Sequence, residues 1–124
     1  RDIPPFGTTH ADHYYGEVPC TRLLTDEEIA DNYEAKTGKI IIERMKNLDP
    51  LAIPSVLVNS HGPFCWGTDA DNAVYNAISL EEIAKMALYT VLLGKSDPVK
   101  KTLLDKHFKR KHGSGAYYGQ GKNK

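Results

Sequence analysis

The stretch VLVNSHGPFCWG, residues 56–67, decides how the fold of this chain is interpreted. Residues 56–58 form an apolar run that predicts a buried strand. Gly62-Pro63 predicts a tight turn, and residues 64–67 predict a second short strand. His61 comes where the first strand ends. A rigid strand that delivers an imidazole to a turn suits a metal ligand or a catalytic base, although a lone histidine there can equally hydrogen-bond the turn.

Three helices are predicted around this strand pair. Residues 25–28 (TDEE) have the capping-box pattern and open a helix to residue 48, with a weak point at Gly38. The clearest helix covers residues 69–93, where apolar residues recur every three or four positions. A basic helix is predicted over residues 97–111, opened by Asp-Pro. The inward stripe expected for the second helix is Ala70, Ala73, Ala77, Leu80, Ala84, Ala87 and Val91, broadened by Val74, Ile78, Leu88 and Leu92.

Both ends of the sequence are predicted to be irregular. Glycine, small and polar residues dominate residues 1–19, which indicates a loop, followed by a possible edge strand over residues 18–21. The tail, residues 113–124, contains four glycines and is expected to be irregular, with residues 121–124 disordered. Tyr117 and Tyr118 are unusual in such a tail. Their presence suggests that the tail docks on its own domain or on a neighbouring molecule.

The composition fits a single domain, or a piece of one, of ordinary globular character. The 124 residues include 40% hydrophobic and 26% charged side chains. The net charge of zero is the sum of two oppositely charged segments. Residues 1–94 have a net charge of −7, and residues 95–124 have a net charge of +7. Cys20 and Cys65 are too few and too far apart for a disulfide framework. Without an apolar run of transmembrane length or a signal peptide, we expect a cytoplasmic protein that does not contact membranes.

A cluster of candidate site residues lies near the start of the chain. His10, Asp12 and His13, with His61, could bind zinc or manganese, but their spacing matches no known metal motif, so solvated loop residues are the stronger interpretation. Asp12 could shuttle protons or could form a local Asx-turn. Tyr118 could pack as plain hydrophobic surface or act as an acid.

The basic run HFKRKH, residues 107–112, is open to three interpretations. Arg110 could bind a phosphate group. The run could instead be a solvated helix end that complements the helix dipole. Binding to nucleic acid is the weakest interpretation, because the aromatic residues are not interleaved with the basic ones.

The combination of five motifs resembles the class II aldolase/adducin family, in particular its sugar-phosphate epimerases, over nearly the whole chain from about Phe6 to Gln120. The motifs are Gly7-Thr8-Thr9-His10-Ala11-Asp12, Tyr15-Gly16-x-Val18-Pro19-Cys20-Thr21-Arg22, Ser60-His61-Gly62-Pro63-Phe64-x-Trp66-Gly67, Leu104-Asp105-Lys106-His107-Phe108-x-Arg110-Lys111-His112-Gly113 and Ala116-Tyr117-Tyr118-Gly119-Gln120. The resemblance implies an α/β fold, a three-layer α/β/α domain with a central, mainly antiparallel sheet. It also implies a homotetramer with active sites between subunits.

The activity implied by this resemblance is the interconversion of L-ribulose 5-phosphate and D-xylulose 5-phosphate, through metal-assisted cleavage and re-formation of the C3–C4 bond. The metal is expected to be zinc, with manganese or cobalt as alternatives, and His61 matches one of its three histidine ligands. Asp12 and Tyr118 match two acid/base residues, the second reaching a neighbouring subunit's site. Thr8, and with it His107 and Arg110, would contact the pentulose 5-phosphate. In this mapping the other histidines near Asp12 are not metal ligands.

Family members are nearly twice as long, and their first half carries an H-x-H pair that this sequence lacks. We therefore expect residues 1–124 to be the C-terminal portion of one such domain, without the N-terminal half and inactive alone. Two rival functions remain open: a sugar-phosphate aldolase, and an adducin-like interaction module without catalysis. The joint presence of Asp12, His61 and Tyr118 argues against the second, because a binding module has no need of all three.

Overall fold

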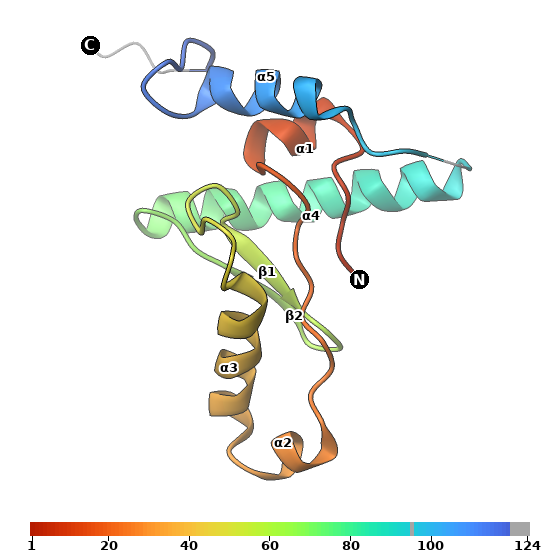
Figure 1. Cartoon of the computed structure of the whole chain (residues 1–124), viewed down its shortest axis with the longest axis vertical. Coiled ribbons are helices and arrows are strands. Elements are labelled where there is room, and N and C mark those ends of the chain that lie inside the picture. Colours follow the sequence, from red (N-terminus) through yellow and green to blue (C-terminus); the bar gives the residue numbers. More distant parts are fainter. Residues whose placement is uncertain (95, 120–124) are drawn as a thin grey trace.

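The computed structural model describes residues 1–94 and 96–119, in which five helices surround a two-stranded antiparallel sheet. Helix α4 (Ala70–Leu92) runs across the molecule, with α1 (Thr8–His13) and α5 (Lys101–Lys111) together on one side of it. The strands β1 (Ser55–Val58) and β2 (Gly62–Cys65) lie beside α4, and α3 (Tyr33–Met45) and α2 (Asp26–Ala30) extend from them (Figure 1). No helix in the described part of the chain is both long enough and apolar enough to span a membrane.

The hairpin forms close to the prediction, but its turn lies earlier. Ser55 pairs with Cys65 and Val58 with Gly62, so Gly62-Pro63 belongs to β2 and the turn consists of residues 59–61. Ser60 takes the left-handed conformation that this reversal needs, with φ of 61°. The turn therefore places His61 directly before β2, at the end of the hairpin. The wider three-layer arrangement with a central sheet stays a prediction, because the described residues form one small sheet.

The predicted loop over residues 1–19 is wrong for its middle part, where α1 forms. Ala11 and Tyr14 are fully buried, and His10 is only 4% exposed, so the interpretation of His10 as a solvated loop residue is also wrong. The Tyr14 hydroxyl lies 2.8 Å from Ser55 Oγ. Burial raises the pKa of Tyr14 to about 12 despite that hydrogen bond. Tertiary burial thus stabilises a helix that local propensity does not favour.

The helix predicted over residues 25–48 is interrupted. The capping box is present, with the Thr25 hydroxyl accepting from the Glu28 amide at 3.2 Å, but α2 ends after Ala30. Asn32 then adopts a left-handed conformation, with φ of 53°, which asparagine tolerates better than most residues. Gly38, the expected weak point, lies inside α3.

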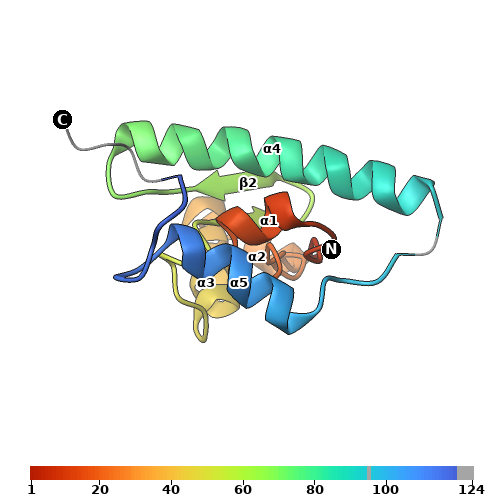
Figure 2. The same cartoon turned by 90° about the horizontal axis from the view of Figure 1, so that it is seen from above.

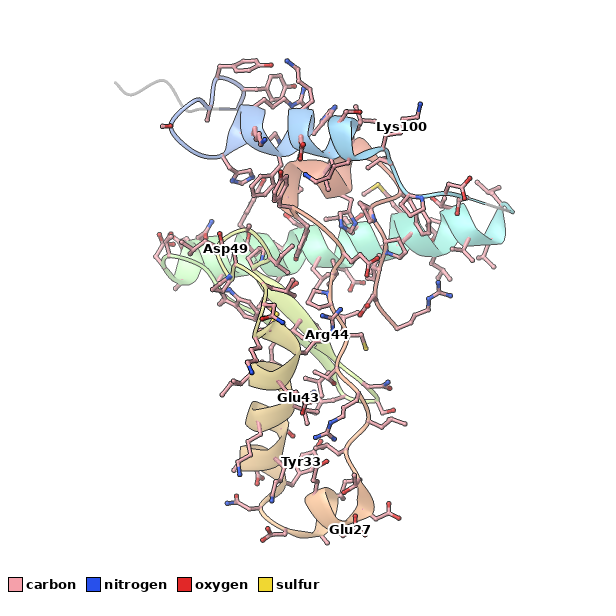
Figure 3. All side chains as sticks on the ribbon, viewed as in Figure 1. Glu27, Tyr33, Glu43, Arg44, Asp49 and Lys100 are labelled. Carbon is pink, nitrogen blue, oxygen red and sulfur yellow. The ribbon has the colours of Figure 1, made fainter. Side chains whose placement is uncertain are left out.

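The basic helix α5 begins at Lys101, three residues after the predicted Asp97-Pro98 opening. The final residues predicted to be disordered, 121–124, lie outside the described part of the chain. Arg44 fixes the N-terminal segment on α3, because its Nη2 donates to Asp2 Oδ2 at 2.9 Å and its Nε donates to the Cys20 carbonyl at 3.0 Å (Figure 3).

The main cluster of buried core residues consists of Tyr14, Val18, Ile53, Leu80 and Ile83. It lies where α4 meets the hairpin and the segment that follows α1. The N-terminus of α4 is capped by Asp69 as predicted, because the Asp69 side chain accepts a hydrogen bond from the Asn72 amide at 2.8 Å. The predicted inward stripe of α4 is confirmed in part, because Leu80 is buried and Ala73, Ala84 and Ala87 are half-buried on the same side. Asn76 and Ile83 complete the buried face, whereas Ala70, Ala77 and Val91 are exposed. The residues expected to broaden the stripe, Val74, Ile78, Leu88 and Leu92, are exposed.

Candidate active site

Asp12, near the C-terminal end of α1, is surrounded by basic side chains of α5. His107 Nδ1 donates to Asp12 Oδ1 at 2.9 Å. Arg110 Nη2 lies 3.1 Å from each carboxylate oxygen, and Lys111 Nζ lies 3.3 Å from Oδ2. Positions 107, 110 and 111 share one face of a helix. Helix α5 therefore directs three basic groups at a single carboxylate.

The surroundings of Asp12 keep its carboxylate charged. The side chain is only 13% exposed, and burial by itself raises the pKa of Asp12. Hydrogen bonds from His107, Arg110 and Lys111 outweigh that effect, so the pKa of Asp12 lies below its ordinary value. A local Asx-turn, the alternative expected from sequence, is not the arrangement found, because the described bonds of this carboxylate go to α5.

The tyrosine pair of the tail docks on the chain's own helix, one of the two arrangements predicted. The amides of Tyr117 and Tyr118 both donate to the Arg110 carbonyl, at 2.8 Å and 2.9 Å. Arg110 Cζ lies 4.1 Å from the centre of the Tyr118 ring, which is cation–π geometry. The same arginine thus contacts Asp12 through its guanidinium edge and Tyr118 through its face.

Asp12 and Tyr118 line one cavity of about 420 Å³. Its wall includes the Pro54 and Trp66 end of the hairpin, and Trp66 is fixed there because its indole Nε1 donates to the Pro50 carbonyl at 2.7 Å. The buried Asn76 of α4 also lines the cavity and donates to the Trp66 carbonyl at 2.8 Å. The remaining wall is mostly polar and aromatic, and its residues include His13, Leu51, Gly67, Thr68, Asn72, Tyr75, Lys111, His112 and Gly119.

Two lining residues were not singled out as site residues from the sequence. Lys111 contacts the Asp12 carboxylate, and His112 Nε2 donates to the Asp12 backbone carbonyl at 2.9 Å. Both belong to the basic run 107–112. The i, i+3, i+4 spacing within that run could have identified the face that meets Asp12, but only the packing of α5 on α1 shows which carboxylate it meets.

The other predicted site residues lie elsewhere. Thr8 is exposed and lines a second cavity of about 440 Å³, between the start of α1 and the later part of α4. His107 and Arg110 lie behind Asp12 and contact it. His61 lies at the turn of the hairpin, and a four-residue strand of roughly 10 Å separates it from the Pro54 end that borders the cavity of Asp12.

The described residues do not fit a complete metal site. A catalytic zinc takes three protein ligands, and residues 1–94 and 96–119 hold no group of three or more histidine, cysteine, aspartate or glutamate residues able to bind a metal ion. His61 is exposed, and its ring stacks on Phe64 with ring centres 5.4 Å apart. One imidazole alone binds a divalent ion weakly.

Comparison with known proteins identifies the class. Residues 1–88 match the family described as the class II aldolase and adducin N-terminal domain, and the chain belongs to that family. The resemblance predicted from the five motifs is confirmed, and the observed mixture of helices with a small antiparallel sheet belongs to such a domain.

Among individual proteins, the chain is similar to "L-ribulose-5-phosphate 4-epimerase UlaF" of Salmonella paratyphi C (strain RKS4594) and of Salmonella choleraesuis (strain SC-B67). Each is 50% identical to it over 119 residues. The protein of the same name from Salmonella typhi has the same identity over the same length. These alignments cover 95% of this chain and 52% of each relative, so the chain spans about half the length of the curated relatives it matches.

Proposed function

We propose that this chain forms part of an enzyme that interconverts L-ribulose 5-phosphate and D-xylulose 5-phosphate by breaking and re-forming the bond between C3 and C4. The observation that carries the proposal is the cavity shared by the Asp12 carboxylate and Tyr118. The identity of 50% to proteins named L-ribulose-5-phosphate 4-epimerase supports the choice of substrate.

The proposed reaction requires two proton carriers. Cleavage begins when the hydroxyl on C4 loses its proton, and re-formation on the opposite face returns a proton to the new hydroxyl. Asp12 would exchange the proton on one face, and the Tyr118 hydroxyl would exchange it on the other. His107 would orient the carboxylate through the bond from Nδ1 to Oδ1, which measures 2.9 Å. We also propose a homotetramer for the whole enzyme. The shared cavity supports a Tyr118 that works with Asp12 of the same chain, whereas the family resemblance implies a tyrosine from a neighbouring subunit.

The cavity also has charge suited to a sugar phosphate. Lys111 and His112 line it, and cationic side chains recognise phosphate oxygens well. His107 and Arg110, predicted to contact substrate directly, would then act mainly through Asp12. A role for Thr8 in the substrate site would require a rearrangement, because it borders the other cavity.

A divalent metal, zinc or alternatively manganese or cobalt, belongs to the proposal for the whole enzyme. His61 would be one ligand, and further ligands would have to come from outside the 124 residues. When bound, the metal would act as a Lewis acid on the substrate oxygens. The described residues alone do not complete its site. We also propose the three-layer α/β/α architecture and a cytoplasmic location for the whole enzyme.

A chimera tests the proposal. Residues 1–119 replace the matching segment of a Salmonella relative, and a coupled assay measures formation of D-xylulose 5-phosphate. We expect activity in the chimera and none in this chain alone. Asp12→Asn should lower turnover at least about 100-fold, within the range for losing a general acid or base. Tyr118→Phe should also lower it while zinc content is unchanged, with the exposed neighbour Tyr117→Phe as the matched control.

Three outcomes would contradict the proposal. Activity of the isolated chain would show that no further segment is needed. Release of free glycolaldehyde phosphate without epimerisation would indicate a sugar-phosphate aldolase. A folded, metal-loaded chimera without any turnover would indicate a non-catalytic interaction module.

A further inference from the structure

Helix α5 is fixed on α1 by a second group of contacts, separate from those to the Asp12 carboxylate. Figure 1 and Figure 2 both show α5 lying along α1. The contacts come from one stripe of side chains on α5 and its C-cap, which we call the docking stripe of α5. It consists of Lys101, Asp105, Phe108 and His112. The intervals of four, three and four residues keep these positions within about 40° of one line on an ideal helix, at 100° per residue.

Tyr15, two residues after the end of α1, is the main partner of the docking stripe. Its hydroxyl donates to Asp105 Oδ1 at 2.5 Å and accepts from Lys101 Nζ at 2.8 Å. Asp105 and Lys101 also pair with each other within α5. The Tyr15 ring packs on Phe108, with ring centres 4.8 Å apart. One tyrosine thus contacts three of the four residues of the stripe.

The backbone of Tyr15 is held by the segment before β1. Its amide donates to the Ala52 carbonyl at 3.0 Å. Because a tyrosine side chain has only two rotatable bonds, an anchored backbone restricts where its hydroxyl lies. Tyr15 therefore connects α5 to the part of the chain that leads into the hairpin.

The docking stripe also reaches the backbone of Asp12. His112 Nε2 donates to the Asp12 carbonyl at 2.9 Å, and the His112 ring stacks on Phe108 with ring centres 4.2 Å apart. The Asp12 carboxylate is meanwhile held by His107 and Arg110, which lie on a neighbouring face of the same helix. Because a helix moves as one rigid unit, the position of the stripe decides how the other face reaches the carboxylate.

We infer that the hydrogen bond between Tyr15 and Asp105 positions the Asp12 carboxylate for proton exchange, by fixing α5 on α1. Within the described part of the chain, neither Tyr15 nor Asp105 lines the cavity of Asp12, so both act through α5 and not on the substrate. This role rests on the proposed function, because the proton exchange that it serves is the one proposed for Asp12. Misplacing a reacting group by about 1 Å can cost about 100-fold in rate.

Tyr15→Phe tests this role in the chimera with a Salmonella relative. It removes the hydroxyl and keeps the ring that packs on Phe108. We expect kcat to fall about tenfold, with KM within about twofold of the parent, because no contact with substrate is lost. Asp105→Ala should give a similar loss, and the double variant should lose little more, because both changes remove one bond. Tyr33→Phe in α3 and Asp97→Ala at an exposed position are the matched controls and should keep full turnover.

Coupling to Asp12 separates positioning from a general effect on stability. In the Asp12→Asn chimera the carboxylate to be positioned is absent, so adding Tyr15→Phe should change the remaining turnover by less than about twofold. A substitution that only lowered the folded fraction of the enzyme would lower turnover by the same factor in both backgrounds. A tenfold loss that persists in the Asp12→Asn background would therefore overturn the inference.

The ring proton of His107 gives a second readout, which needs no activity. His107 Nδ1 carries a proton while it donates to Asp12, and the hydrogen bonds of an imidazole decide which ring nitrogen is protonated. Nitrogen NMR at pH 8 of a histidine-labelled chimera, assigned with His107→Gln, should show a protonated Nδ1 in the parent. Tyr15→Phe and Asp105→Ala should each give a mixture of the two tautomers.

The His107 signal also keeps the test available if one variant does not fold. The Asp105 side chain is 30% exposed, so Asp105→Ala is the milder of the two changes. A His107 signal that is unchanged in every folded variant of the Tyr15–Asp105 pair would overturn the inference.

The two proposals can fail separately. An Asp12→Asn chimera with full turnover would contradict the proposed function and, with it, the role of Tyr15. An inactive Asp12→Asn chimera, together with unchanged turnover in Tyr15→Phe and Asp105→Ala, would overturn only the positioning role and leave the proposed function in place.

Discussion

Two regions carry the residues singled out by the sequence, and they differ in how complete they are. Around Asp12, helices α1 and α5 bring three basic groups to one carboxylate and enclose a cavity. Around His61, the hairpin turn presents one exposed imidazole, whose described ring contact is Phe64. The first region holds a full set of partners within the chain. The second offers one group of a site that needs several.

The difference explains which substitutions should matter to the isolated chain. Residues around the Asp12 cavity are held by contacts that a substitution removes or obstructs. His61 protrudes into solvent, so its role depends on groups that this chain does not supply. The stability of the chain should therefore respond strongly to changes in the first region and weakly to changes in the second.

Gly67→Ala should give the largest effect. A Cβ on Gly67, in the cavity wall, would lie 2.6 Å from the Ala73 amide nitrogen and 2.8 Å from the Asn72 carbonyl carbon, both backbone atoms of α4. We expect a loss of about 3 kcal/mol in the free energy of unfolding, as in overpacked cores. Urea denaturation measures it. Gly38→Ala, inside α3 with open space at its Cβ, is the control and should stabilise by up to about 1 kcal/mol.

Asp12→Ala should follow, with a loss of about 2 kcal/mol. The substitution leaves His107, Arg110 and Lys111 close together without their shared anion. Breaking a buried ion pair costs more than this, but these side chains keep some exposure and solvent screens the remaining charges. Urea denaturation again measures it, with the exposed Glu17→Ala as control. Equal stability of the two variants would show that the cluster is not held by Asp12.

The sequence predicted the elements of both regions better than their contacts. The hairpin and the α4 cap follow from local patterns, in which the decisive residues are close in sequence. The Asp12 cluster joins residues more than 90 positions apart, so no local pattern indicates that α5 packs on α1. Asp12 and Tyr118 were identified by resemblance to a family, and only packing shows that both line one cavity. On α4 the residues expected to broaden the inward stripe, Val74, Ile78, Leu88 and Leu92, were mispredicted, because they are exposed.

The pH dependence of stability should show two separate losses, and the first region contributes to both. Burial lowers the pKa of His10 below its ordinary 6.5 and outweighs its bond to the Gly16 carbonyl, and burial also lowers the pKa of His13. The unfolded chain then binds more protons than the folded one as the pH falls below about 6.5, so stability decreases there. The lowered pKa of Asp12 adds a second decrease below about pH 4, where the unfolded carboxyl takes up its proton first.

Urea denaturation at intervals from pH 8 to pH 3 separates these losses. His10→Gln should reduce the slope between pH 6.5 and pH 5. Asp12→Ala should reduce the decrease below pH 4 without removing it, because the pKa values of Glu27, Glu28 and Asp105 are lowered too. His61→Ala should keep both losses. A stability that is constant from pH 7 to pH 5 would mean that His10 is accessible to protons in the folded state.

His61→Ala should have the smallest effect, within about 0.5 kcal/mol, as for most exposed sites. The effect of zinc on the unfolding midpoint provides a second test of this prediction. A ligand that binds only the folded state stabilises it in proportion to the logarithm of its concentration over its dissociation constant. Because His61 offers one imidazole and the described residues hold no metal-binding group of three, 100 μM zinc should leave the unfolding midpoint unchanged in both proteins. A zinc-dependent rise that disappears in His61→Ala would show that the turn recruits further ligands within this chain, and the contrast between the two regions would no longer hold.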